Sequence, residues 1–208
     1  MTVPHFATLL AQWQSAFEAL NISAEVQTRL AVYLDHLWKR NMDLNLVSRK
    51  MTPEVLITDH LLDSLIALPH LPEVALIADL GTGGGLPAIP LAMCRPNTRF
   101  LLFEKSPLKC KFLRELFSMC DNLQMAGTLG PKEVFPEVDL VIARGFKSVG
   151  HILSVTPSHH ERGGAYLLYK ARRARIDEEL AGLSNLAARI IPLTPYGEAQ
   201  ERNLVCIP

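Results

Sequence analysis

The sequence predicts an α/β protein with a Rossmann-like sheet of about seven strands, mostly parallel and covered by helices on both faces. From residue 74 onward, short apolar segments alternate with stretches of helical periodicity. This alternation is typical of a parallel sheet whose strands are connected through helices. With 208 residues, the chain has the length of one domain of ordinary size and can bury a full core.

The first part of the chain is expected to be helical. Apolar residues recur at three- and four-residue steps over 9–20 and again over 26–37. Between these segments, Asn21-Ile22-Ser23 supplies a break and a candidate N-cap. The aromatic residues of both segments are interpreted as core residues.

A polar connector over 41–50 leads to a third predicted helix. This helix is expected to begin near Thr52-Pro53, because threonine is a good N-cap and proline suits the first turn. It is expected to stop before Pro69. Residues 1–70 should therefore form a helical extension packed on a main domain of residues 71–208.

The alternating region provides the strands of the predicted sheet. The strand candidates are 75–79, 99–104, 122–126, 138–143, 165–170, 188–193 and 203–207, and the clearest helices between them are 87–94, 106–119 and 174–187. In such sheets ligands bind at the carboxyl ends of the strands, near the point where the strand order reverses. Asp79, Glu104 and Arg144 each end or follow one of these strands, so all three are expected at one edge of the sheet.

The segment from Asp79 to Pro90 combines a strand end, a glycine-rich turn and a helix start. Gly81, Gly83 and Gly85 occupy alternate positions, and an apolar helix follows. Glycines in such a turn allow a ligand to approach the bare backbone. The segment therefore predicts a site for a nucleoside-type cofactor.

The spacing decides which cofactor the turn fits. A dinucleotide fingerprint requires a third glycine three positions after Gly83, where this chain has Leu86, and no Gly-Lys-Ser/Thr of a P-loop follows. What remains is Asp-x-Gly-x-Gly-x-Gly, the form typical of S-adenosylmethionine (AdoMet) methyltransferases. The predicted fold is accordingly the class I AdoMet-methyltransferase fold, with Asp79, Gly81, Gly83, Gly85 and Leu86 at the cofactor.

Glu104 is the candidate acid for the ribose of the cofactor. It ends the second predicted strand, 19 residues after Gly85. A carboxylate at that place can accept hydrogen bonds from both ribose hydroxyls. The alternative is a surface acid beside a purely structural glycine turn.

Composition limits the class of protein. Hydrophobic residues make up 49% and charged residues 20% of the chain, and no apolar run approaches the ~20 residues of a membrane span. The four cysteines are scattered without metal-ligand spacing, which suits a reducing compartment. We expect a cytoplasmic protein with no membrane segment and no metal site. The one histidine pair, His159-His160, is expected in a solvated loop.

Charge summed over the chain gives no support for a nucleic-acid partner. The 21 basic residues balance 21 acidic ones, whereas a dedicated nucleic-acid binder usually carries a basic excess. Basic residues nevertheless cluster over 105–114 and over 170–175. Each cluster is interpreted either as a binding surface or as a solvated face.

Several motifs in a fixed order connect the chain to one family. Asn45, Arg49 and His60-Leu-Leu-Asp63-Ser64 precede the glycine turn, Gly85-Leu86-Pro87-Ala88-Ile89-Pro90-Leu91 continues it, and Ala143-Arg144-Gly145-Phe146 follows. With these motifs the chain resembles the bacterial RsmG (GidB) family of AdoMet-dependent methyltransferases of small-subunit ribosomal RNA. The resemblance extends from about residue 25 to the C-terminus.

This resemblance implies a reaction and the roles of several residues. It implies methylation of N7 of a guanine in the 530 loop of 16S ribosomal RNA, as free RNA or within the small ribosomal subunit. It places Gly81 and Leu86 at the cofactor, Arg144 at both the cofactor and the target guanine, and Leu129 and Gly130 beside the adenine. The chain is expected to act as a monomer.

Arg144 is the candidate catalytic residue, with the role of orienting the guanine. N7 of guanine already has an in-plane lone pair, so no general base is required, and proximity and orientation supply most of the rate gain. Arg144 can bond the guanine O6 or a phosphate. Its structural alternative is an ion pair with Glu104 or Asp79.

Four further residues are candidates for contacting the RNA: Arg49, His60, Lys170 and Arg172. Lys170 and Arg172 belong to the second basic cluster. Arg49 and His60 either orient the RNA or lock the N-terminal helices onto the sheet.

The chain departs from the family in three places. Gly127-Thr-Leu-Gly-Pro131 stands where the family usually has an arginine followed by an acid, which leaves the adenine contacts open. Lys170-Ala171 stands where the family tends to have Lys-Gly, and Ala88 replaces a glycine at a helix start, a change that a helix accepts readily. Two other functions stay open: an AdoMet methyltransferase acting on a small molecule or a protein, which the zero net charge favours, and a non-catalytic AdoMet-binding module.

Overall fold

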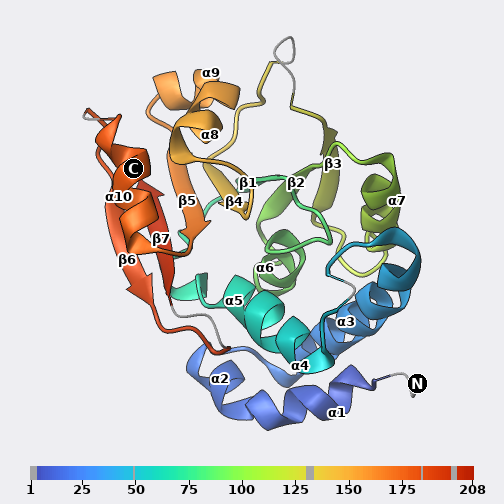
Figure 1. Ribbon diagram of the computed structural model, residues 1–208. Helices are drawn as coiled ribbons and strands as arrows, with labels where there is room; N and C mark the ends of the chain where they lie inside the picture. Colours follow the sequence, from blue (N-terminus) through green and yellow to red (C-terminus); the bar gives the residue numbers. More distant parts are fainter. Residues whose placement is uncertain (1–3, 49, 130–133, 184, 198–200) are drawn as a thin grey trace.

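The computed structural model describes residues 4–48, 50–129, 134–183, 185–197 and 201–208. These residues contain one seven-stranded sheet in the order β3-β2-β1-β4-β5-β7-β6 (Figure 1). The strands are β1 Leu76–Leu80, β2 Arg99–Phe103, β3 Leu123–Gly127, β4 Leu140–Arg144, β5 Ala165–Lys170, β6 Arg189–Leu193 and β7 Arg202–Ile207. All seven predicted strands are confirmed, with their ends shifted by at most two residues.

Strand pairing is parallel from β3 to β5, and β7 runs antiparallel to both of its neighbours, β5 and β6. The chain leaves β1 for β2 on one side and later returns to pair β4 on the other side of β1. The carboxyl ends of β1 and β4 therefore form the switch point at which open α/β sheets bind ligands.

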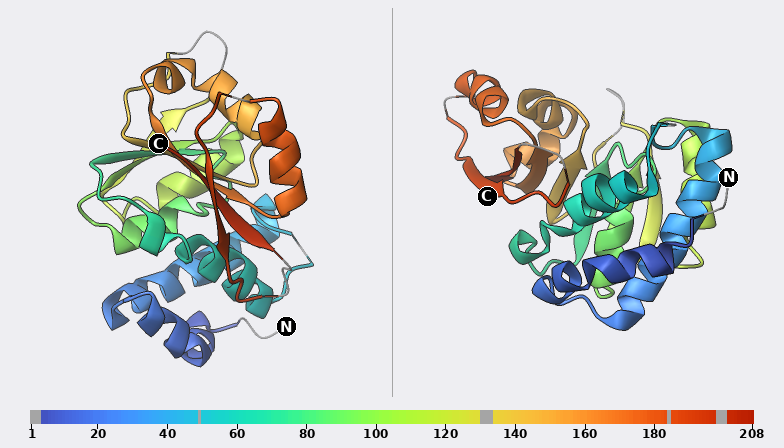
Figure 2. Two further views of the ribbon diagram at one scale, coloured as in Figure 1. Left: turned by 90° about the vertical axis from the view of Figure 1, so that its left-hand side faces the viewer. Right: turned by 60° about the horizontal axis from the view of Figure 1, so that its bottom comes forward.

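Helices cover both faces of the sheet (Figures 1 and 2). Those before the sheet are α1 Phe6–Leu10, a 3-10 turn Ala11–Trp13, α2 Gln14–Ala19, α3 Ala24–Leu44, α4 Pro53–Val55, a π-helix Leu56–Leu62, α5 Asp63–Leu65 and a 3-10 turn Leu68–His70. Those between the strands are α6 Ala88–Cys94, α7 Pro107–Glu115, α8 Val149–Val155, α9 Pro157–Glu161 and α10 Arg173–Ala181. α8 and α9 are additions to the helices named from the sequence, and α10 ends before Gly182, six residues short of its predicted end.

The expected N-caps of the early helices are confirmed. The Ser23 hydroxyl accepts a hydrogen bond from the Val26 amide at 3.3 Å, and Thr52 does the same for Val55 with Pro53 in the first turn. The expected connector over 41–50 is wrong in its first part, because α3 continues to Leu44. α3 ends where Asn45 adopts a left-handed conformation, with φ of +50°.

Each face of the sheet has its own hydrophobic core. One core joins the helices of the first 71 residues, α6 and α7 to inward side chains such as Ile77, Phe100 and Ile142. The other core joins α8, α10 and the segment around Phe135 to the opposite face, which carries Val141. The N-terminal helices therefore share one continuous core with the sheet.

The expectation of a solvated loop for His159-His160 is wrong. Both residues lie in α9, and the His159 side chain is buried against Tyr166 and Phe135. Its Nε2 lies 3.0 Å from the carbonyl oxygen of Ala165. The helix points the first histidine into the core, whereas His160 stays exposed.

No helix within the described ranges is both long and apolar enough to cross a membrane. Within the same ranges no group of three or more His, Cys, Asp or Glu side chains is arranged to hold a metal ion.

Candidate functional site

A pocket of about 620 Å³ opens at the carboxyl ends of β1, β4 and β5. Its walls are the glycine turn after β1, the segment after β4, the end of β5 and the π-helix. Its titratable wall residues are Asp59, His60, Asp63, Arg144, Lys147, Tyr169, Lys170 and Arg202. The pocket thus lies at the switch point of the sheet and between the sheet and the N-terminal helices.

The glycine turn is held in place by backbone bonds to the neighbouring strand. The amides of Gly81 and Thr82 donate to the carbonyl oxygen of Phe103 at 2.8 and 3.1 Å. Gly81, Gly83 and Gly85 have φ of +74°, +62° and +91°, the left-handed region that glycine enters at little cost. A Cβ on Gly85 would lie 2.4 Å from Ile89, whereas a Cβ on Gly83 would meet nothing closer than 3.7 Å. The open side of Gly83 therefore faces free space at the pocket wall.

The N-terminal helices support this turn directly. The hydroxyl of Tyr33, on α3, donates to the carbonyl oxygen of Gly84 at 2.7 Å. Leu37 and Leu46 lie against Gly84 as well. Burial raises the pKa of Tyr33 well above its usual range, so the hydroxyl keeps its proton and remains a donor.

Glu104 lies between the pocket and a second hollow. Its carboxylate accepts hydrogen bonds from the Gly83 amide at 3.0 Å and the Ser106 amide at 2.8 Å. Its own amide donates to Gly127, beside a hollow of about 300 Å³ that Leu129 helps to line. Each carboxylate oxygen retains a lone pair for a further donor.

Asp79 is a buried acid below the glycine turn. Thr82 and the Ala88 amide approach its carboxyl group, but neither oxygen forms a hydrogen bond of normal geometry with a described residue. Burial raises the pKa of Asp79 to about 7. A buried polar group without partners is costly, so its retention points to a role in ligand binding.

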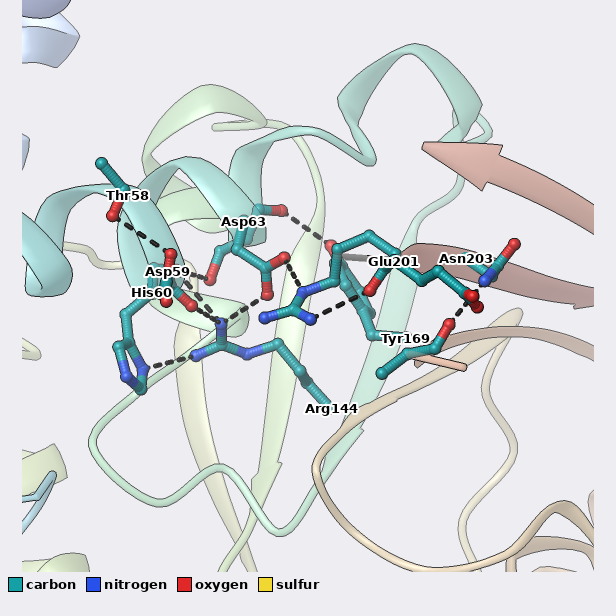
Figure 3. A network of polar contacts seen from close by, with 11 residues as sticks. Thr58, Asp59, His60, Asp63, Arg144, Tyr169, Glu201 and Asn203 are labelled. Carbon is teal, nitrogen blue, oxygen red and sulfur yellow. Dashed lines mark hydrogen bonds and ion pairs between the residues drawn. The ribbon is translucent and has the colours of Figure 1, made fainter. Parts of the chain in front are cut away.

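Arg144, at the end of β4, is fixed by the π-helix (Figure 3). Its Nη1 donates to the carbonyl oxygens of Asp59 and His60 at 3.2 and 3.3 Å and forms an ion pair with Asp63 at 3.0 Å. The second carboxylate oxygen of Asp63 bonds Arg202, from the start of β7. The ion pair of Arg144 is therefore with Asp63, and the alternative partners Glu104 and Asp79 are wrong.

The guanidinium of Arg144 keeps part of its donor capacity. Its Nη2 contacts Nδ1 of His60 at 3.3 Å, which accounts for one of two Nη2 hydrogens. The second Nη2 hydrogen and the Nε hydrogen have no partner among the residues that the structure describes. These two N–H groups share one edge of the planar guanidinium and can bind a ligand in the pocket.

His60 is a neutral donor in this site. Burial, together with the charge of Arg144, lowers the pKa of His60 to about 4. Because a guanidinium only donates, Nδ1 of His60 accepts and the ring proton stays on Nε2. His60 thus presents an uncharged N–H at the pocket wall.

The other candidate RNA-binding residues lie in different environments. Lys170 lines the pocket, but its ammonium bonds Glu179 and the carbonyl oxygen of Lys147, both at 2.7 Å. Arg172 is exposed at the start of α10 and does not line the pocket. Arg49 and Gly130 lie outside the described residues.

Sequence reasoning missed Arg202 and Lys147 on the pocket wall. Arg202 arrives there because β7 is antiparallel, so its first residue meets the carboxyl end of β5. No local pattern marks that direction. Lys147 could have been inferred from the sequence, since it follows the strand that ends in Arg144.

Comparison with known proteins identifies the family of the chain. The model of the protein family GidB, described as rRNA small subunit methyltransferase G, matches residues 26–204. The chain belongs to this family. It is 39% identical to ribosomal RNA small subunit methyltransferase G 1 of Bdellovibrio bacteriovorus, over 92% of this chain and 95% of the relative. It is 35% identical to the methyltransferase G of Methylobacillus flagellatus, over 91% and 92%.

Solved structures place this chain in the class I methyltransferase fold. The cofactor-bound protein Rv0187 from MTB has a TM-score of 0.58 and 15% identity, covering 99% of this chain and 98% of that one. A SAM-dependent O-methyltransferase from Thermotoga maritima has a TM-score of 0.52 and 16% identity, covering 82% and 70%. At this level of identity the likeness concerns the fold.

AdoMet is the methyl donor of this protein, and the residues present fit it. Gly83 offers free space beside its backbone, and below the same turn neither carboxyl oxygen of Asp79 has a hydrogen bond of normal geometry to a described residue. Glu104 lies between this turn and the hollow at Leu129, as a ribose between a methionine part and an adenine would require. The chain therefore has one candidate partner for each part of the cofactor.

Glu104→Ala should weaken AdoMet binding by about 1.5–3 kcal/mol, the range for hydrogen bonds to a charged group. The variant loses both the proposed ribose acceptor and the anchor of the Gly83 amide. Isothermal titration calorimetry measures the change, and Glu104→Gln, which keeps one acceptor oxygen, should lose less. Wild-type affinity in a folded Glu104→Ala protein would make this residue a surface acid only.

Asp79→Asn should stabilise the cofactor-free protein in a pH-dependent way. Between about pH 4 and pH 7 the folded wild-type protein holds a proton that the unfolded chain has released, so its free energy of unfolding falls as the pH rises. Asparagine does not titrate, so it adds no such pH dependence to the free energy of unfolding. Urea unfolding should show a gain of roughly 2–4 kcal/mol at pH 8 that shrinks toward pH 5. A stability difference between the two proteins that does not vary with pH would contradict the raised pKa of Asp79.

Proposed function

We propose that this protein transfers a methyl group from AdoMet to N7 of a guanine in the 530 loop of 16S ribosomal RNA. The names of its relatives support small-subunit ribosomal RNA as the substrate. The N7 atom and the 530 loop follow from the resemblance of the motifs around Asp63 and Arg144 to the RsmG family. The proposal includes a monomeric enzyme acting in the cytoplasm.

One observation carries the proposal: the free edge of Arg144 beside the glycine turn. The arginine is fixed at Nη1 by two carbonyl oxygens of the π-helix and by Asp63 at the start of α5, so the remaining Nη2–H and Nε–H have a defined direction. Arginine commonly binds guanine at its O6 and N7 edge, and a contact to O6 alone leaves the N7 lone pair free for the methyl group. Holding O6 would orient the adjacent N7 for methyl transfer.

Methyl transfer to N7 requires little of the protein beyond this orientation. AdoMet supplies an electrophilic methyl group on a sulfonium. The N7 lone pair needs no deprotonation, so a pocket whose histidine is neutral and bound to Arg144 is sufficient. Holding the two reacting atoms about 3–3.5 Å apart and in line accounts for most of the rate gain.

The RNA contacts complete the proposal. We assign His60 to the nucleotide through its Nε2–H, and the exposed Arg172 to a backbone phosphate outside the pocket. Lys170 holds the segment after β4 through the Lys147 carbonyl, which positions the pocket wall toward the RNA. Arg49 keeps its proposed RNA contact from the sequence motif alone.

The test is methylation of small ribosomal subunits that lack the modification. Purified protein, labelled AdoMet and such subunits should yield 7-methylguanosine, mapped to the 530 loop by nuclease digestion and mass spectrometry. Naked 16S RNA, tested in parallel, shows which form is the substrate. A label in another nucleoside, or none, would refute the assignment.

A methyltransferase for a small molecule or a protein is the second candidate. It is favoured by the zero net charge of the chain and by ion pairs within the second basic cluster, where Arg173 pairs with Asp177 and Arg175 with Glu178. Raising the salt concentration separates the two candidates, because phosphate contacts release counterions. Activity that falls steeply with salt supports RNA, whereas activity independent of salt supports the second candidate.

A further inference from the structure

A base that is methylated inside a pocket needs a surface on which to stack. Extruded bases are commonly held between aromatic or apolar side chains, which repay the stacking energy lost when the base leaves its helix. Three aromatic rings line the described walls of the 620 Å³ pocket: His60, Phe146 and Tyr169. They differ in how much of the ring a base could reach.

Two of these rings are held by other contacts and are not available for stacking. Tyr169 is buried, and its hydroxyl donates to the carbonyl oxygen of Ser64 at 2.7 Å. His60 is fixed by its contact with Arg144 (Figure 3). Phe146 is half-buried and has no polar group, so its ring is the one available for stacking.

The position of Phe146 suits the reaction. A Cβ on Gly81 would lie 2.6 Å from Cδ2 and 3.2 Å from Cε2 of the ring, so one edge of Phe146 rests on the cofactor turn. Phe146 is also two residues from Arg144, the proposed partner of O6. The turn between them is made by Gly145, whose φ is +61° and whose added Cβ would meet nothing within 4 Å. Glycine is thus used there for the backbone bend that brings the ring to Gly81.

We propose that Phe146 is the stacking residue for the target guanine; this rests on the proposed function. When the N7 lone pair forms the bond to the methyl carbon, the electron pair of the breaking S–C bond returns to sulfur. The sulfonium charge is thereby transferred to the guanine ring, and no proton moves. A π-face attracts a cationic ring more strongly than a neutral one. Phe146 therefore stabilises the transition state more than the bound substrate, and its loss lowers the rate of the chemical step.

The test compares variants at Phe146 in single-turnover methylation of unmodified small subunits. Phe146→Ala and Phe146→Leu should both lower the rate by about 5- to 150-fold, the range for loss of one base–aromatic stack. Phe146→Tyr keeps the ring and should stay within about threefold of wild type. The AdoMet Kd, measured by calorimetry, should stay within about twofold in all three. The control is His151→Ala, which removes the ring that lies 6.1 Å from Phe146 outside the pocket and should leave the rate unchanged.

Each outcome decides between the proposals. A Phe146→Leu protein with the wild-type rate would overturn the stacking role, because leucine keeps apolar volume without a π-face. A Phe146→Ala protein whose AdoMet Kd rises in step with the loss of rate would make Phe146 a support of the cofactor turn instead. If the wild-type protein itself methylates no guanine N7, the proposed function fails, and the stacking role fails with it.

Discussion

Gly83→Val should abolish AdoMet binding while the protein stays folded. Gly83 has φ of +62°, and an added Cβ would point into open space at the pocket wall, with Gly81 O at 3.7 Å as its nearest neighbour. The left-handed conformation costs roughly 1–2 kcal/mol for a residue with a Cβ, and a β-branched side chain suits it least. The two valine methyl groups would also occupy the space that the ligand needs.

Calorimetry with AdoMet and circular dichroism check this expectation together. No binding heat should appear for Gly83→Val at concentrations that saturate the wild-type protein, and the helical signal should be retained. Gly182→Val is the matched control, because Gly182 has φ of −81° and an added Cβ there meets nothing within 4 Å. Unchanged affinity in folded Gly83→Val would show that the cofactor does not approach this backbone.

The parts of the fold that could be predicted are those encoded locally. Each strand is a short apolar run, and all except the half-buried edge strand β6 contain buried residues, so alternation with helices is enough to find all seven. The glycine turn was equally visible, because positive φ and close approach restrict Gly81, Gly83 and Gly85 to one residue type. These signals need no knowledge of distant partners.

The parts that could not be predicted depend on contacts between distant segments. Asp63 meets Arg202 across 139 residues of sequence, and only the antiparallel direction of β7 brings them together. The ion-pair partner of Arg144 could not be predicted for the same reason: the acids at the ends of neighbouring strands are visible in the sequence pattern, whereas the approach of Asp63, at the start of α5, is not. The burial of His159 could not be predicted either, because it depends on contacts with Tyr166 and Phe135.

Asp63→Ala should cost about 3 kcal/mol of the free energy of unfolding, the low end for breaking a buried ion pair, since both partners are partly exposed. The Asp63 side chain is 8% exposed and lies between Arg144, at 14%, and Arg202, at 23%. Alanine leaves both guanidinium groups without their shared counter-charge. Urea unfolding of the cofactor-free protein measures the loss, and Asp63→Asn, which keeps one acceptor oxygen, should lose less.

A double-mutant cycle separates charge from packing. If the loss comes from two uncompensated guanidinium groups, adding Arg202→Met to Asp63→Ala should cost little or even restore stability, so the two effects should differ from additivity by about 1 kcal/mol or more. Strict additivity, or a single-variant loss below about 1 kcal/mol, would contradict the network.

Asp63 provides only one of the three acceptors that bond Nη1 of Arg144. The other two, the carbonyl oxygens of Asp59 and His60, remain in the Asp63→Ala protein. Methylation by Asp63→Ala should therefore fall less than by Arg144→Ala, which removes the whole O6 donor. The acid between the two arginines then serves chiefly to make a doubly cationic pocket compatible with a folded chain, and the arginine that it stabilises serves the reaction.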